Sequence, residues 1–354
     1  MADDEAQDYV DDELVRENVN VFCQTCQELM LSINFGIPDD LRPARTFCIL
    51  DTSTCPLCIF FFTALRSLAI EAPQQMEITL DIARGPCDSA RLSPYLSCGT
   101  EDHCSGLHII KLDDHRSAAQ HGDVFRFIDR NRINFSRLES WIKHCQQHHG
   151  RTCSRDSENI EYPVTKPASI RVIDCTERRI INTTFLASYV ALSYVWGTVA
   201  EAFEAEEIPG EDLHNTLPAR LPNTVEDAIT ATIRLGYRYL WVDKYCINQS
   251  NQDELQAQIS IMDTIYHAAS VTIIAAAGDD SRFGLPGVSD RSRIKQNKIV
   301  LYGNTWASAK DPLESVSESV WSTRAWYVKH FIRKWSTTQA SERRQITKEK
   351  FLSQ

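Results

Sequence analysis

Four segments in the second half of the chain decide its fold: Tyr189-Val-Ala-Leu-Ser-Tyr-Val-Trp-Gly197, Leu221-Pro-Asn-Thr-Val-Glu-Asp-Ala-Ile229, Tyr239-Leu-Trp-Val-Asp-Lys-Tyr-Cys-Ile-Asn-Gln249 and Met262-Asp-Thr-Ile-Tyr-His-Ala-Ala269. The first and third begin with apolar runs of strand length, whereas the second and fourth have apolar residues at helical spacing. Another apolar strand is expected at 271–276. Strands that alternate with helices predict right-handed βαβ crossovers and a parallel sheet. We therefore expect an α/β domain.

The elements around these strands have recognisable boundaries. The first helix is expected to have Thr224 as its N-cap, with Asp227 three residues later in a capping-box-like arrangement, and to end before Gly236. The second helix is expected to include the apolar positions from Leu255 to Tyr266. Two short apolar runs between residues 170 and 181 flank a polar turn, which predicts a hairpin ahead of the first strand.

In their order and spacing, the four segments resemble the fungal heterokaryon incompatibility (HET) domain, over about residues 170 to 290. This family is thought to be distantly related to the TIR fold, so the resemblance implies a TIR-like, flavodoxin-like sheet. It also implies an effector of self/non-self recognition that triggers programmed cell death in fused fungal cells. Such an effector would act with other incompatibility or signalling proteins, or as a homo-oligomer.

A ligand-binding cleft is expected at the carboxyl ends of the strands, where ligands bind in open α/β sheets. Asp243 ends one central strand, and Tyr194, Trp196 and Gly197 follow another. Together they offer a carboxylate, an aromatic wall and a glycine turn that a ligand can approach closely. The structural alternative places Trp196 and Trp241 in the core, with Asp243 capping the turn that follows it.

The TIR comparison implies an enzymatic alternative, because some TIR domains cleave NAD. An NAD glycohydrolase breaks the bond between nicotinamide and ribose and needs a carboxylate near the ribose, as glycosidases do. Glu254 is the nearest candidate on the second helix, with Asp243 as the other catalytic carboxylate. Many HET sequences have a glutamate where this chain has Gln258, and a glutamine cannot carry negative charge. A catalytically inactive HET scaffold is therefore a further alternative. We expect Gln258 to be a ligand-binding residue.

Two C-x2-C pairs near the amino terminus predict a structural zinc site. Cys23 and Cys26 precede Cys55 and Cys58, with 28 residues between the pairs. Four thiolates complete a closed tetrahedral shell around one zinc ion, and their sulfurs should then lie within about 4 Å of one another. The alternative is a set of buried thiols beneath an apolar helix at 57–70.

A second group of possible ligands lies around the end of a helix at residues 141–153. Cys145, His149 and Cys153 are spaced four residues apart, so they share one face only if the helix continues through Gly150. Core thiols at a helix end explain the same pattern. Whether this group binds a metal stays open.

Composition limits the class of protein. The net charge is -11, but most of it comes from seven acidic residues in the first thirteen positions, which predict a disordered acidic tail at 1–18. No basic stripe favours a nucleic-acid partner. No apolar run has the length of a membrane span, and the amino terminus lacks the features of a secretory signal. A cytoplasmic protein with reduced cysteines is expected.

A length of 354 residues favours two domains. We expect a Cys/His-rich, mostly helical leader region at 19–155, a polar linker, and the HET domain at 166–290. The remainder, 291–354, is expected to be a carboxyl-terminal extension. The segment 327–335 departs there from the pattern of HET proteins, as in a truncated or aberrant gene product.

Overall fold

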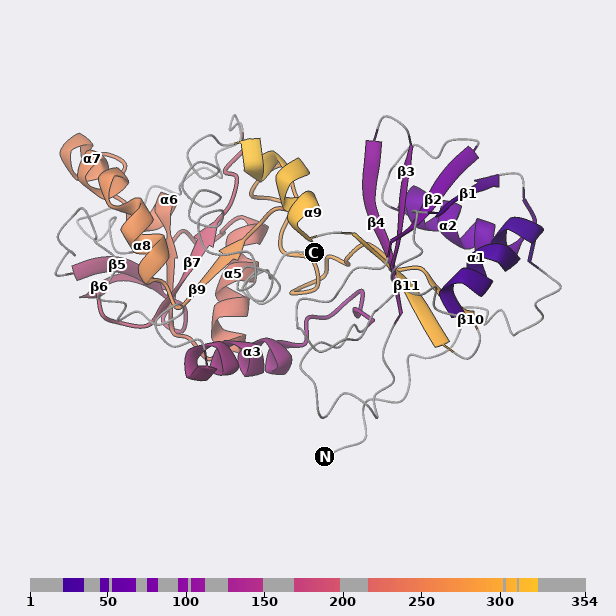
Figure 1. Ribbon diagram of the computed structural model, residues 1–354. Helices are drawn as coiled ribbons and strands as arrows, with labels where there is room; N and C mark the ends of the chain where they lie inside the picture. Colours follow the sequence, from indigo (N-terminus) through magenta and orange to yellow (C-terminus); the bar gives the residue numbers. More distant parts are fainter. Residues whose placement is uncertain are drawn as a thin grey trace. The chain divides into compact units, whose positions relative to one another are not determined.

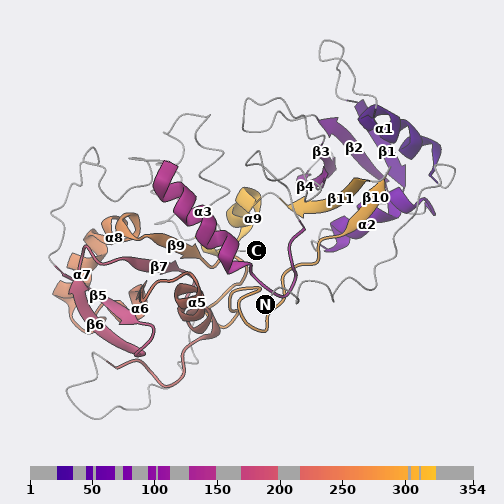
Figure 2. The same cartoon turned by 90° about the horizontal axis from the view of Figure 1, so that it is seen from below.

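The protein is described by a computed structural model, drawn in Figures 1 and 2. The chain forms two compact units, Met1–Ile128 with Ile294–Asp311 and Asp129–Arg293 with Pro312–Gln354. Each unit is described by itself. The residues that the structure describes are 22–34, 45–50, 53–67, 75–81, 95–100, 103–111, 127–148, 169–197, 216–301, 304–310 and 312–323.

The second unit contains a five-stranded sheet in the order β6-β5-β8-β7-β9. Its central strand is β7 (Tyr189–Ser193), which pairs in parallel with both β8 (Tyr239–Val242) and β9 (Val271–Ile274). The prediction that these three strands are parallel in one sheet is confirmed. All five residues of β7 are buried, as expected for a strand covered on both faces.

The remaining two strands form the predicted hairpin. β5 (Ser169–Asp174) and β6 (Arg179–Thr184) are antiparallel, and β5 also pairs antiparallel with β8. The sheet is therefore mixed, because the hairpin is added to the parallel strands. Oδ1 of Asp174 accepts hydrogen bonds from the backbone N–H groups of Thr176 and Glu177, which closes the turn between β5 and β6.

Helix α5 (Asn223–Arg234) connects β7 to β8 and buries the expected apolar face. Its amino terminus differs from the prediction: the cap position is Pro222, which makes no side-chain cap bond, and Thr224 lies inside the helix. Thr224 and Asp227 form tertiary hydrogen bonds instead, described below. Gly236 ends the helix as predicted, with φ of +81°.

The predicted helix over 255–266 is interrupted in the structure. β8 leads directly into the short helix α6 (Asp243–Cys246), followed by α7 (Gln252–Ser260) and α8 (Met262–Ala268). Ile261, with φ of −112° and ψ of 7°, separates α7 from α8 and turns its own side chain into the core. No residue of α7 is buried, and both views place α7 at the edge of its unit (Figures 1 and 2).

The first unit has an antiparallel sheet that the sequence did not lead us to expect. Its six strands run in the order β1-β2-β3-β4-β11-β10. The helix predicted at 57–70 is present as α2 (Pro56–Ser67), and α1 (Gln24–Asn34) precedes it. The strands are β1 (Arg45–Leu50), β2 (Gln75–Asp81), β3 (Tyr95–Thr100), β4 (His103–Lys111), β10 (Lys298–Leu301) and β11 (Asn304–Lys310).

The unit boundaries differ from the expected ones, because β11 pairs with β4 and carries the segment 294–311 into the first unit. The second unit also includes α3 (Phe135–His148), expected in the leader region, and α9 (Pro312–Glu318) with the 3-10 helix η4 (Val320–Thr323). Cys145 is buried on α3, whereas His149 and Cys153 lie outside the described residues, as do the acidic tail and the linker.

No helix in the described part of the chain combines the length and the apolar character that crossing a membrane requires.

Candidate functional site

The loops that follow the three parallel strands meet at one edge of the sheet. The indole Nε1 of Trp196, after β7, donates a 3.0 Å hydrogen bond to Oδ1 of Asp243, after β8. The hydroxyl of Ser281, in the loop after β9, donates a 3.0 Å bond to the backbone oxygen of Trp196. These contacts follow from the parallel pairing, because the carboxyl ends of parallel strands lie at the same edge.

Gly197 has a conformation that favours glycine. Its φ is +93°, and a Cβ added there would lie 2.9 Å from the Cβ of Asp280. The glycine thus lets the loop after β7 turn sharply while the loop after β9 approaches it closely. The expectation of a glycine turn at this edge is confirmed.

The side chains at this edge combine a carboxylate, an aromatic ring and a cation. Trp196, Asp243 and Lys244 are all half-buried, and Nζ of Lys244 lies 5.9 Å from the centre of the Trp196 ring. Oδ1 of Asp243 also accepts a 2.7 Å bond from the backbone N–H of Lys244. Asp243 therefore holds the turn that follows it and orients Trp196, so part of the structural alternative is correct.

Trp241 and Tyr194 belong to the protein interior. Trp241 is fully buried in the sheet, with its ring edge-on to that of Tyr266 at 5.2 Å between centroids. Tyr194 is also buried, directly after β7. Cys246 is a buried thiol, and burial raises the pKa of Cys246 to about 12.

Glu254 and Gln258 are both half-buried on α7, one turn apart. Asn251 caps this helix, with its side-chain oxygen 3.1 Å from the backbone nitrogens of Asp253 and Glu254. Neither the Glu254 carboxylate nor the Gln258 amide has a hydrogen bond or ion pair to any residue that the structure describes. Their roles in catalysis and ligand binding stay predictions.

Polar residues of α5 hold the loop after β9. The backbone N–H of Gly284 donates to the Thr224 hydroxyl at 3.1 Å, and Asp227 accepts from the Leu285 N–H at 2.6 Å and from the Ser289 hydroxyl at 2.5 Å. Thr224 and Asp227 are buried on the mostly apolar face of the helix. Polar side chains on such a face are the signal that could have predicted these tertiary bonds.

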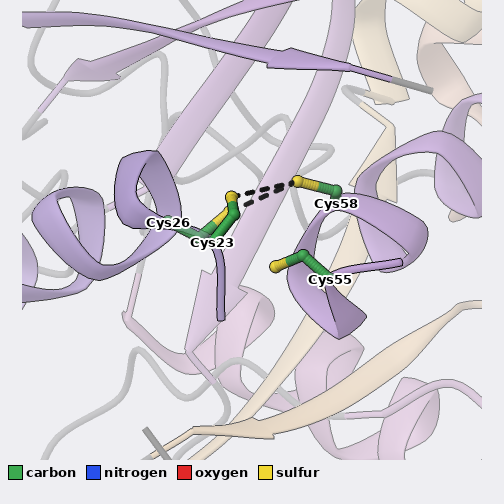
Figure 3. Close-up of side chains that lie close together, drawn as sticks. All are labelled: Cys23, Cys26, Cys55 and Cys58. Atoms are coloured by element: carbon green, nitrogen blue, oxygen red, sulfur yellow. Dashed lines mark hydrogen bonds between the residues drawn. The ribbon is translucent and has the colours of Figure 1, made fainter. Parts of the chain in front are cut away.

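The four predicted metal ligands form a second candidate site, in the first unit (Figure 3). Cys23 immediately precedes α1 and Cys26 lies in its first turn; Cys55 and Cys58 repeat this arrangement at α2. The Sγ atom of Cys58 lies 3.7 Å from that of Cys23 and 3.5 Å from that of Cys26, and all four sulfurs lie within 4.8 Å of one another. The four sulfurs converge, within 4.8 Å rather than the predicted 4 Å, and the four cysteines could hold a metal ion.

The cluster favours a thiolate at one position. Hydrogen-bond donation from Cys26 lowers the pKa of Cys58 to about 5, although burial acts in the opposite direction. The same hydrogen bond, together with burial, raises the pKa of Cys26, and burial raises the pKa of Cys23. The amino-terminal turns of two helices also face the sulfurs, and helix amino termini stabilise negative charge.

These features define an α/β domain with polar residues gathered at the carboxyl edge of its parallel strands. Comparison with protein families agrees with that class, because residues 189–329 match the family model described as "Heterokaryon incompatibility protein (HET)". The chain thus contains a region of the HET family, over residues 189–329.

A curated relative shares this region. The chain is 34% identical over 123 residues to "Heterokaryon incompatibility protein 6, OR allele" of Neurospora crassa. The match takes in 32% of this chain and 18% of the relative, so the chain spans about a fifth of that protein's length. No solved structure matches the chain.

Proposed function

We propose that this chain is an effector of heterokaryon incompatibility, which triggers programmed cell death after fusion of unlike fungal cells. The observation that carries the proposal is the match of residues 189–329 to the HET family, on a domain whose loops meet through Trp196 and Asp243. The relative from Neurospora crassa, named for heterokaryon incompatibility, supports the same role.

Inducible expression in a filamentous fungus tests this role. Expression of the wild-type chain should stop growth and kill hyphal compartments, as scored with a vital dye. Gly197→Ala should prevent killing, because the added Cβ would meet Asp280 at 2.9 Å. Gly236→Ala is the matched control, since Gly236 also has a positive φ but has no atom within 4 Å of an added Cβ. Normal growth during wild-type expression would argue against the effector role.

We further propose that the effector acts through other incompatibility or signalling proteins, or through copies of itself. An effector without catalysis needs only surface contacts, so this proposal does not depend on a cleft. Light scattering of the purified chain across a range of concentrations tests self-assembly. Affinity purification from fungal extract, with the Gly197→Ala variant as the comparison, tests for other partners.

NAD cleavage is the alternative that a TIR-like domain implies. It is supported by the half-buried carboxylate of Asp243, held beside the Trp196 ring at the edge where α/β sheets bind ligands. Incubation with NAD should then release nicotinamide, and both Asp243→Asn and Glu254→Gln should abolish the release. Activity that survives Glu254→Gln would remove Glu254 from the mechanism, and no release by the wild-type chain would favour an inactive scaffold.

We propose that Cys23, Cys26, Cys55 and Cys58 bind one structural zinc ion. Zinc–sulfur bonds of about 2.3 Å in a tetrahedron place the sulfurs about 3.8 Å apart, close to the separations of 3.5 and 3.7 Å found here. Metal analysis should find one equivalent of zinc in the wild-type chain and less than half in Cys58→Ser. Cys145→Ser, which removes a buried thiol outside the cluster, should retain the metal.

A further inference from the structure

A hollow in the second unit has no part in the functions proposed above. It has a volume of about 540 Å³, within the usual range for small-molecule sites. Three segments far apart in the sequence line it: the loop before α3, the last residue of α5 and the loop after β9. Both views show α3 and α5 side by side (Figures 1 and 2). The lining residues are Asn131, Arg132, Arg234, Val288, Ser289 and Asp290.

Hydrogen bonds between these segments hold the walls in place. The backbone N–H of Ile133 donates to the oxygen of Gly287 at 2.9 Å, and the Ser292 hydroxyl lies 2.8 Å from Oδ1 of Asn131. On the other side, the bond from the Ser289 hydroxyl to buried Asp227 attaches the loop after β9 to α5. The hollow is thus already formed in the free chain, so a ligand would not have to order it.

Two guanidinium groups dominate the charge of the hollow. The Arg234 guanidinium carbon lies 4.2 Å from the centre of the buried Phe135 ring. Stacking of this kind restrains the guanidinium while leaving its N–H groups at the rim for a ligand. Arg132 supplies the second guanidinium, and no described carboxylate forms an ion pair with either one.

A third arginine lies behind the wall. Nη1 of Arg293 donates to the backbone oxygens of Asp129 and Arg132 at 2.9 and 3.4 Å, which fixes the loop that carries Arg132. Among the described residues, Nε of Arg293 has no acceptor. Burial lowers the pKa of Arg293, against the opposing effect of Asp129. By its position, Arg293 adds a third guanidinium next to the hollow without lining it.

We propose that this hollow binds a small phosphorylated metabolite, with Arg132 and Arg234 holding the phosphoryl group. Guanidinium groups match phosphate geometry because each can donate two parallel N–H bonds. The Ser289 oxygen and the Asp290 carboxylate are acceptors, suited to hydroxyl groups elsewhere on the same ligand. The ligand class is thus a phosphomonoester with a polar, hydroxyl-bearing body. This site is independent of the proposed incompatibility role.

Calorimetric titration of the 354-residue chain tests the site with three probes: inorganic phosphate, ribose 5-phosphate and uncharged ribose. Ribose 5-phosphate should bind best, phosphate more weakly, and ribose not measurably. Raising the ionic strength should weaken the binding of both anions, because the guanidinium groups are exposed. Arg234→Gln should reduce the affinity for ribose 5-phosphate at least tenfold. Arg234→Lys should keep only part of the wild-type affinity.

Two further variants separate the parts of the site. Arg220→Gln, at an exposed arginine that does not line the hollow, should leave binding unchanged. Asp290→Asn should strengthen phosphate binding and reduce the advantage of ribose 5-phosphate over phosphate. Circular dichroism of each variant verifies the fold. Absence of binding by every probe would overturn the proposal, as would equal losses in Arg220→Gln and Arg234→Gln.

Discussion

Trp196 and Asp243 join the loops of two adjacent parallel strands through one hydrogen bond of 3.0 Å between Nε1 and Oδ1. The two residues are 47 positions apart in the sequence, and each follows its strand within three residues. A bond between a neutral N–H and a carboxylate is stronger than one between neutral groups. It thus links the indole at this edge to the same carboxylate that caps the turn after β8.

Removal of this bond should cost measurable stability. Trp196→Phe keeps an aromatic ring but loses the indole N–H, and we expect a loss of about 1 kcal/mol in the free energy of unfolding, because both partners are half-exposed. A double-mutant cycle with Asp243→Ala, followed by urea denaturation, isolates the pair. A coupling energy near zero would mean that the bond contributes nothing in solution.

Gly197 and Gly236, two of the four described glycines with positive φ in this domain, should differ in their tolerance of alanine. Gly236→Ala forces a side chain into a left-handed conformation and should cost about 1 kcal/mol. Gly197→Ala adds a contact of 2.9 Å with Asp280, so it should cost about 2 kcal/mol or more. Thermal unfolding of the two variants under the same conditions compares them, and equal losses would show that the loop after β9 moves away at little cost.

The sequence predicted the elements whose pattern is local. β7 and β8 are continuous apolar runs, and the apolar face of α5 repeats every three or four residues, so periodicity alone identifies them. The four cysteines could likewise be found from their spacing, because each C-x2-C pair occupies one helical turn.

Features that depend on distant pairing could not be predicted in this way. β4 reaches its partner β11 across about two hundred residues, with His108 opposite Ala309, so neither strand indicates the other. Thr224 has the local pattern of a helix cap, yet its hydroxyl accepts from Gly284, sixty residues away. In both cases tertiary contacts outweigh local preference. The hollow lined by Arg132 and Arg234 likewise exists only after three segments come together.

The ion pair between Asp174 and Arg238 should make stability depend on pH. Burial alone would raise the pKa of Asp174, but hydrogen bonds from Arg238 and from the backbone of Glu177 and Thr176 outweigh it and lower that pKa below 3.8. A carboxyl whose pKa is lower in the folded state stabilises the fold above its unfolded pKa. That contribution is lost as the pH falls through the folded value.

Arg238→Gln should therefore destabilise the domain at pH 7, and its difference from wild type should disappear as the pH falls below about 3.8. Urea denaturation between pH 3 and pH 7 measures the effect. Arg220→Gln, which removes an exposed positive charge with no described ion pair, is the control for net charge. A difference that stays constant over this pH range would assign the loss to packing of the Arg238 side chain on Tyr239 rather than to the ion pair.

Metal removal should act on the first unit. If zinc holds the amino-terminal turns of α1 and α2 together, a chelator should lower the melting temperature of the transition that includes these helices, and added zinc should restore it. Hydrogen exchange of α1 and α2 locates the change, with α5 in the other unit as the internal control. Unchanged exchange of α1 and α2 after complete metal removal would contradict a structural role for the ion.

Asp227 should be the most sensitive polar residue of α5. Its buried carboxylate accepts from the Leu285 N–H and the Ser289 hydroxyl, and both donors belong to the loop after β9. Asp227→Ala would leave these donors without an acceptor, so we expect a loss of about 2 to 4 kcal/mol in the free energy of unfolding. Asp227→Asn keeps the shape but replaces one oxygen with a donor, so its loss should be smaller.

The readout that separates loop release from general destabilisation is amide exchange at Leu285. In Asp227→Ala this amide should exchange much faster than in wild type. The exchange rate of the amides in β7 should change only as far as the global stability changes. Thr232→Ala supplies a matched comparison, because the Thr232 hydroxyl is also buried on α5 but donates to the Ala228 oxygen in its own helix rather than bonding the loop after β9. If both variants raise exchange at Leu285 equally, Asp227 does not hold the loop specifically.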